Sequence, residues 1–135
     1  MTRYASITLL ICGDKVWIAK RALDHKIMPG LLECAGGSTE DTETSLDTAV
    51  REVQEEACLD IARSRFEYRG RIFVDNWWYS LFFLKLHEVE KPKNTETTKR
   101  FPWFLHSPED LRMNELSPAL GALVSIFMQE LRVKK

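Results

Sequence analysis

One stretch of the sequence constrains the fold more than any other: GGSTEDTETSLDTAVREVQEEACL, residues 36–59. It begins with a pair of glycines, crosses an acidic loop and enters a segment with helical periodicity. On a helix of about 3.6 residues per turn, Glu52, Glu55 and Glu56 lie at i, i+3 and i+4 and therefore share one face. The sequence thus predicts a helix that presents three carboxylates together on one side.

Like charges on one helical face repel each other by roughly a few tenths of a kcal/mol per pair. A helix tolerates this repulsion where a cation lies between the carboxylates. Carboxylate oxygens select hard divalent cations, Mg²⁺ first and Mn²⁺ second. Such an ion binds a di- or triphosphate and lowers the pKa of water, which favours substitution at phosphorus by metal-activated water. The alternative interpretation is a solvated acidic helix face without a metal.

The spacing within this stretch resembles the Nudix box, G-x5-E-x7-R-E-U-x-E-E-x-G-U, in which U is a bulky aliphatic residue. Gly37, Glu43 and the segment 51–59 match every specified position except one, where Cys58 replaces the last glycine. A glycine at the end of a helix adopts the left-handed conformation at little cost, whereas a cysteine there loses roughly 1 kcal/mol. We therefore expect Cys58 to affect the helix end rather than the carboxylates.

The resemblance implies a hydrolase that cleaves a nucleoside diphosphate linked to another group, with Mg²⁺ as cofactor and Mn²⁺ as a substitute. It implies that Glu52, Glu55 and Glu56 are catalytic metal ligands, with the backbone carbonyl of Gly36 as a further ligand.

The resemblance also assigns roles outside the metal ligands. Gly37 would be structural, and Glu43 and Arg51 would form the ion pair that holds the acidic loop against the helix. The general base of several family members lies on the loop before the last strand, where Glu96 is the candidate. A glutamate of the box, Glu55 or Glu56, is the alternative base.

Substrate contacts are predicted on two strands. The segment VWIAKR, residues 16–21, looks like the corresponding strand end of MutT-type nucleotide pyrophosphatases. Arg21, or Lys20 in its place, would then bind a substrate phosphate, and a surface salt bridge is the alternative. Trp77, Trp78 and Phe82 offer faces on which a base can stack, unless this aromatic stripe belongs to the core.

The short chain, the VWIAKR strand and a Ser-Pro start of the last helix favour the MutT-like group. That group hydrolyses nucleoside triphosphates, including oxidised ones, to monophosphate and pyrophosphate. The position that binds the base in that group corresponds to Leu116. Asn114 lies two residues earlier and is our candidate for this contact, so a preference for oxidised guanine stays open.

Other substrates remain as alternatives. ADP-ribose-cleaving relatives tend to carry a proline where this chain has Val74, and relatives acting on dinucleoside polyphosphates tend to carry a tyrosine near Trp77. Capped RNA, dinucleoside polyphosphates and NDP-sugars are therefore kept as alternatives. So is an isopentenyl diphosphate isomerase-like activity, although the cysteine-bearing catalytic segment is absent. A catalytically silent binding module is a further alternative, but such members commonly lose a box glutamate, and none is lost here.

Composition narrows the possible partners. The 19 basic and 20 acidic residues nearly balance, which gives no general attraction to nucleic acid. The three cysteines show no C-x-x-C spacing, which argues against zinc and for reduced thiols in the cytoplasm. The apolar run at residues 7–12 is too short to span a membrane or to form a signal peptide. We expect a small-molecule nucleotide as the partner, with no indication of oligomeric state.

The remaining patterns predict a single α/β domain over residues 1–135. A helix should begin near Thr44, where Thr44 and Asp47 form a capping box. A short helix should begin at Ser107, and a last helix should run from Ser117 to about Arg132. The predicted strands are 4–12, 15–21, 31–35, 66–74, 77–88 and 101–105. This order predicts a mixed sheet between helices, the α/β/α sandwich of the Nudix fold.

Overall fold

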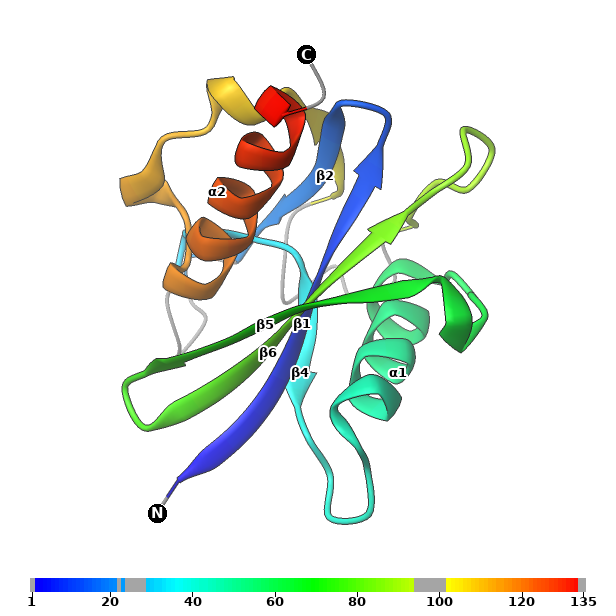
Figure 1. Cartoon of the computed structure of the whole chain (residues 1–135), viewed down its shortest axis with the longest axis vertical. Helices are drawn as coiled ribbons and strands as arrows, with labels where there is room; N and C mark the ends of the chain where they lie inside the picture. Colours follow the sequence, from blue (N-terminus) through cyan, green and yellow to red (C-terminus); the bar gives the residue numbers. More distant parts are fainter. Residues whose placement is uncertain (1, 22, 24–28, 94–101, 134–135) are drawn as a thin grey trace.

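A mixed β-sheet lies between two α-helices in the computed structural model, which describes residues 2–21, 23, 29–93 and 102–133 (Figure 1). The strands are β1 (Arg3–Cys12), β2 (Lys15–Lys20), β3 (Leu32–Glu33), β4 (Ala35–Ser38), β5 (Phe66–Val74), β6 (Trp77–Lys85) and β7 (Phe104–His106). The helices are α1 (Ser45–Ala57) and α2 (Pro118–Val133), with the 3₁₀ turns η1 (Arg63–Arg65), η2 (Pro108–Asp110) and η3 (Met113–Glu115). The predicted α/β/α sandwich with a mixed sheet is confirmed.

Strand β1 lies at the centre of the sheet. It pairs in parallel with β6, from Arg3 opposite Trp77 to Ile11 opposite Lys85. On its other edge it pairs antiparallel with β4 and then with β2. Strand β5 extends the sheet beyond β6, and β3 and β7 pair with β2. The parallel β1–β6 pair is what makes the sheet mixed.

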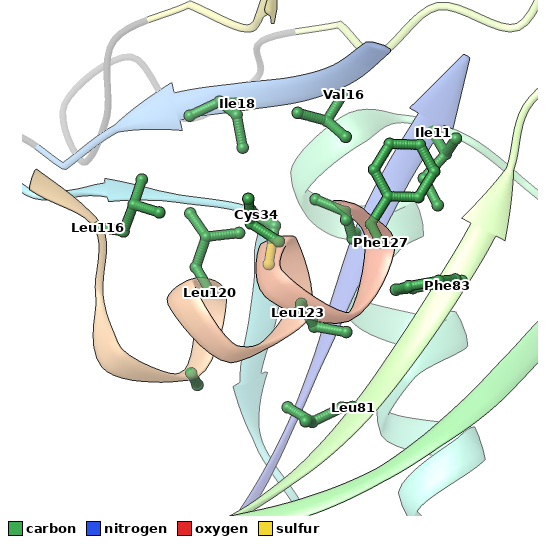
Figure 2. Packing of buried hydrophobic residues seen from close by; sticks show 13 residues of the cluster. Ile11, Val16, Ile18, Cys34, Leu81, Phe83, Leu116, Leu120, Leu123 and Phe127 are labelled. Atoms are coloured by element: carbon green, nitrogen blue, oxygen red, sulfur yellow. The ribbon is translucent and has the colours of Figure 1, made fainter. Parts of the chain in front are cut away.

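The two faces of the sheet carry separate cores because successive side chains of a strand point to opposite faces. Helix α2 covers one face and α1 the other (Figure 1). Figure 2 shows Leu120, Leu123 and Phe127 of α2 directed toward the strands. Side chains at alternate positions of β6 enter the opposite core, where Phe82 and Leu84 pack with residues of α1. The second half of β6 is therefore buried on both sides.

Helix α1 begins and ends as its sequence predicts. The Thr44 hydroxyl accepts a hydrogen bond from the Asp47 N–H, and the Asp47 carboxylate accepts one from the Thr44 N–H, at 3.1 and 2.9 Å. This is the predicted capping box. At the other end Cys58 adopts a left-handed conformation with φ 57° and ψ 34°. The departure from the Nudix box therefore lies at the C-cap.

A tight turn at Asp75 and Asn76 lies between β5 and β6. Both residues have positive φ, 50° and 66°, which is the pattern of a two-residue hairpin turn. It joins β5 and β6 without a break in register next to the turn.

Several predicted boundaries are wrong. Residues 31–35 form not one strand but two, the whole of β3 and the start of β4, and Gly36 and Gly37 continue β4. The reason is nonlocal, because these glycines pair with the first half of β1. The predicted helix at Ser107 is a single 3₁₀ turn, and β6 ends at Lys85. Strand β7 covers the end of the predicted strand 101–105, whose first residue lies outside the described residues. Among the described helices, none is long and apolar enough to cross a membrane.

The left-handed Cys58 gives a stability prediction. Cys58→Gly should raise the free energy of unfolding by about 1 kcal/mol, since glycine adopts this conformation without a steric penalty. Urea denaturation of the wild type and the variant measures the difference. Cys58→Ala is the matched control, since it removes the thiol but keeps the Cβ, and it should give no gain. Catalytic activity should be unchanged in both variants, and its collapse would show that the thiol itself takes part in function.

Candidate active site

Strand β4 passes close to α1 because its central residues have no side chains. The Gly36 N–H donates a hydrogen bond to Oε1 of Glu56 at 2.7 Å. A Cβ on Gly37 would lie 2.5 Å from the carboxyl carbon of Glu52, and a Cβ on Gly36 would lie 2.6 Å from Cγ2 of Ile7. At Gly36 the Ser6 carbonyl oxygen is also only 2.7 Å away, so no side chain fits there, whereas a side chain at Gly37 would force the Glu52 carboxylate to move. The glycine pair therefore allows two of the three box carboxylates to lie against the strand.

Arg51 links the acidic loop to the helix. Its Nε lies 2.7 Å from Oε2 of Glu43, and its Nη2 donates to the Ser38 carbonyl at 2.9 Å. Its Nη1 lies 2.8 Å from Oε1 of Glu52 and 3.3 Å from Oε2 of Glu55. The Glu43–Arg51 ion pair is the one that the sequence predicts. The contacts with Glu52 and Glu55 were not predicted.

The positive charge of Arg51 changes the pKa of its partner Glu43. The Arg51 guanidinium, together with the Glu40 N–H, lowers the pKa of Glu43 from an ordinary 4.5 to about 2. The hydroxyl of Thr48 donates a further hydrogen bond to this carboxylate at 3.1 Å. Glu43 is therefore held as a carboxylate, and the loop is tied to α1 at neutral pH.

The three glutamates of the predicted metal site differ in their surroundings. Glu56 is buried at 8% exposure. The Glu52 side chain is 12% exposed, and that of Glu55 is 47% exposed. Within the described residues, no three acidic, histidine or cysteine side chains converge on a point where they could hold a metal ion. In this arrangement Glu52 contacts Arg51, and Glu56 accepts from Gly36.

The donor chemistry nevertheless fits a hard divalent cation. The available atoms are carboxylate oxygens from one helical face, next to the backbone of β4, and oxygen ligands of this kind suit Mg²⁺ and Mn²⁺. The space beside Gly37 that a Cβ would fill is bordered by the Glu52 carboxylate. Glutamate side chains can rotate toward an ion without any change in the helix. Residues Glu52, Glu55 and Glu56 therefore remain suitable ligands.

A cleft opens beside β4. Its walls come from β1, β4 and β6, and its end is formed by the start of α2. It is lined by Ala5, Ile7, Arg21, Glu33, Cys34, Gly36, Gly37, Ser38, Val74, Trp77, Tyr79, Ser117, Pro118 and Ala119. Because Gly36 and Gly37 border the cleft and also contact Glu56 and Glu52, no side chain of β4 at these positions separates the cleft from the carboxylates.

The two cations predicted to bind phosphate lie in different places. Arg21 lines the cleft, and its Nε lies 2.6 Å from Oε2 of Glu33, a carboxylate that is itself buried. Arg21 therefore forms an ion pair, although with a buried carboxylate and not at the surface as the alternative interpretation has it. Its contact with a substrate phosphate stays a prediction. Lys20 is exposed at the end of β2 and is not among the residues that line the cleft.

The three predicted aromatic contacts also separate. Trp77 lines the cleft and stacks on Tyr79 with 6.2 Å between ring centroids. Trp78 points to the other face of β6, where the Arg71 guanidinium lies 4.4 Å from its ring centroid. Phe82 is 3% exposed and belongs to the core under α1. For Phe82 the core interpretation is therefore the correct one, and a stacking role is not available to it.

The predicted base contact is not at the cleft. Asn114 is exposed in η3 and does not line the cleft. Leu116 is 4% exposed and points into the core with Leu120 (Figure 2). Ser117 lines the cleft, whereas Asn114 and Leu116 do not. The candidate base Glu96 lies outside the described residues.

Sequence reasoning missed five polar or aromatic residues of the cleft: Glu33, Cys34, Ser38, Tyr79 and Ser117. Glu33 had a usable signal, because it is a charged residue inside a short apolar strand directly before the glycines. Tyr79 follows from Trp77 by the two-residue period of a strand. Burial raises the pKa of the Tyr79 hydroxyl, so this group is a neutral hydrogen-bonding group at neutral pH.

The chain matches the model of a known protein family. A family model described as "NUDIX domain" matches residues 1–124. No curated protein sequence matches the chain.

Solved structures show the same fold. A MutT NUDIX hydrolase from Burkholderia pseudomallei has a TM-score of 0.80 and 16% identity, over 93% of this chain and 97% of that one. The ORF135 protein of E. coli has a TM-score of 0.66 and 24% identity, over 99% and 94%. A bifunctional NMN adenylyltransferase/ADP ribose pyrophosphatase from Francisella tularensis, complexed with AMP and a Mn ion, has a TM-score of 0.73 and 13% identity, over 96% of this chain and 42% of that one.

The Glu43–Arg51 ion pair predicts an acid-dependent loss of stability. A carboxylate whose folded pKa is depressed contributes stability above its unfolded pKa, and that stability is lost as pH falls through the folded pKa. For Glu43 the window therefore runs from about pH 4.5 down to about 2. Glu43→Gln should be less stable than the wild type at pH 7, and the difference should shrink across this window.

Urea denaturation at pH 7, 4.5 and 3 measures the change. Glu40→Gln is the matched control, because the Glu40 carboxylate is 70% exposed and lies 3.7 Å from the same guanidinium. Its stability should follow that of the wild type at every pH. A Glu43→Gln variant that does the same would contradict the structural role of this pair.

Proposed function

Because the chain belongs to the NUDIX domain family and is a Nudix hydrolase, we propose that it hydrolyses a nucleoside triphosphate to the monophosphate and pyrophosphate in the presence of Mg²⁺. The proposed substrates are ribo- or deoxyribonucleoside triphosphates with a normal or an oxidised base. One observation carries the proposal: the glycines of β4 lie between the α1 carboxylates and the cleft. A phosphate chain at this edge of the cleft would lie next to the carboxylates, and the nucleoside would occupy the cleft itself.

Glu52, Glu55 and Glu56 would hold the divalent ion, with the backbone carbonyl of Gly36 as a further ligand. When bound, Mg²⁺ or Mn²⁺ would neutralise phosphate oxygens and lower the pKa of water. The donor set supports this assignment, since it consists of oxygen atoms from one helical face. Arg51 would keep its structural role through Glu43, although it would have to share the Glu52 carboxylate with the ion.

The residues of the cleft would bind the rest of the substrate. Arg21, already in the cleft, would contribute positive charge toward a phosphate, while its ion pair with Glu33 fixes its direction. Trp77 would stack on the base. Glu96 remains the candidate for the general base, with Glu55 or Glu56 as the alternative. We also propose one domain over residues 1–135 and a cytoplasmic location, both of which stay predictions from the sequence.

A hydrolysis panel tests the proposed substrate class. The protein is incubated with Mg²⁺ and with normal and oxidised (d)NTPs, NDP-sugars, dinucleoside polyphosphates or capped RNA, and the products are identified. We expect monophosphate and pyrophosphate from at least one triphosphate, and no turnover after chelation of the metal. Turnover confined to NDP-sugars, dinucleoside polyphosphates or capped RNA would mean that this class, and not a triphosphate, is the substrate. No turnover of any compound would favour a binding module.

Glu56→Gln separates the carboxylate charge from the fold. The amide oxygen that this substitution introduces can still accept from the Gly36 N–H, so the variant should fold normally. Mg²⁺-dependent turnover should fall on the order of 100-fold or more, since a metal ligand is lost. Glu88→Gln, at an exposed position, is the control and should keep full activity. Near-normal turnover of a folded Glu56→Gln protein would refute the assignment of this ligand.

Trp77 and Trp78 form a matched pair, because they are neighbours on β6 that point to opposite faces. Trp77→Leu should raise KM about tenfold with little change in kcat, since a stacking surface for the base is lost. Trp78→Leu should leave KM unchanged, because Trp78 lies outside the cleft. Steady-state kinetics on the best substrate of the panel measures both. Equal KM values for the two variants would rule out the stacking role of Trp77.

A further inference from the structure

The last turn of α1 is held from outside the helix. The final carbonyl groups of a helix have no partner within it. Two donors from distant parts of the chain reach these groups in α1. The Lys93 N–H donates to the Ala57 carbonyl at 2.9 Å, and the Trp103 indole N–H donates to the Glu56 carbonyl at 3.2 Å. Both bonds end on the turn that carries Glu56.

Burial of the Trp103 ring holds in place the hydrogen bond that its indole N–H donates to the Glu56 carbonyl. Trp103 is 7% exposed, and its ring belongs to the core cluster on the α1 face, together with Val53 and Ala57. A buried indole N–H without an acceptor is unfavourable, so the ring and its donor are both held in place. The Glu56 carbonyl is thus tied to the segment just before β7, which is distant from α1 in the sequence.

Glu56 is consequently restrained on two sides. Its carbonyl accepts from Trp103, and its carboxylate accepts from the Gly36 N–H at 2.7 Å. Two residues later Cys58 adopts the left-handed conformation, which glycine tolerates and cysteine does not favour. Without the bonds from outside the helix, the strained Cys58 would favour opening of this turn, and opening would move the Glu56 carboxylate away from β4.

We propose that Trp103 is a positioning residue for Glu56. Its indole N–H keeps the last turn of α1 helical, offsets the missing glycine at position 58 and holds the Glu56 carboxylate beside Gly36. The inference rests on the proposed function only where it concerns metal binding and turnover. The effect on the helix end concerns the protein without metal or substrate.

Trp103→Phe tests the proposal, because phenylalanine keeps an aromatic ring in the core and removes the donor. Amide hydrogen exchange at residues 54–58 of the metal-free protein should become about fivefold faster. The dissociation constant for Mn²⁺, measured by calorimetry with Mn²⁺ alone, should rise about fivefold. For the best substrate of the panel kcat should fall, while KM stays within about twofold.

Trp17→Phe is the matched control. Trp17 packs against the same core cluster, and its buried indole nitrogen has no hydrogen-bond partner in the described part of the chain. This variant should leave exchange at residues 54–58, the affinity for Mn²⁺ and kcat unchanged. In the Trp103→Phe background, Cys58→Gly should restore slow exchange, because glycine stabilises the same helix end without the indole.

Equal exchange rates and equal Mn²⁺ affinities for Trp103→Phe and Trp17→Phe would overturn the proposal. Exchange is measured without metal or substrate, so it decides this inference even if the hydrolysis panel gives no turnover. If Trp103→Phe does not fold, the proposal is tested on the wild type by measuring hydrogen exchange of the Trp103 indole N–H. Slow exchange supports the proposal, and exchange as fast as that of a solvent-exposed indole overturns it.

Discussion

The rest of the site depends on the close approach of β4 to α1. Gly36 and Gly37 have no side chains, so the strand lies directly against Glu52 and Glu56, and the Gly36 N–H binds a glutamate oxygen at 2.7 Å. A methyl group at Gly36 would collide with Ile7 and with the backbone of Ser6, and one at Gly37 would displace the Glu52 carboxylate. The approach places the carboxylates along one edge of the cleft, and it requires both the pairing of β4 with β1 and the packing of α1 on the sheet.

The second constraint is electrostatic. Three carboxylates on one helical face repel each other, and in this structure Arg51 supplies the compensating charge to Glu52 and Glu55 as well as to Glu43. A divalent ion would therefore compete with Arg51 for the Glu52 carboxylate. The same guanidinium thus stabilises the loop through Glu43 and keeps the carboxylates close together before an ion binds.

Local patterns were predictable from the sequence, and nonlocal ones were not. The capping box at Thr44, the left-handed Cys58 and the shared face of the glutamates depend on neighbouring residues, so spacing alone revealed them. The strand conformation of Gly36 and Gly37 depends on pairing with β1, which glycine propensity does not indicate. Side chains alternate between the two faces of β6, but both faces carry apolar residues. The alternation alone therefore could not show that Trp77 faces the cleft and Phe82 the core. Leu116 and Asn114 were misplaced because the start of α2, rather than η3, reaches the cleft.

We propose that the α1 glutamates bind a divalent ion beside the glycines of β4, and anomalous diffraction from crystals grown with Mn²⁺ can locate such an ion. We expect an anomalous peak within bonding distance of carboxylate oxygens of Glu52 and Glu56 and of the Gly36 carbonyl oxygen, with Arg51 still bound to Glu43. The absence of a peak at saturating Mn²⁺, or a peak held only by the exposed loop at Glu40 and Asp41, would contradict it.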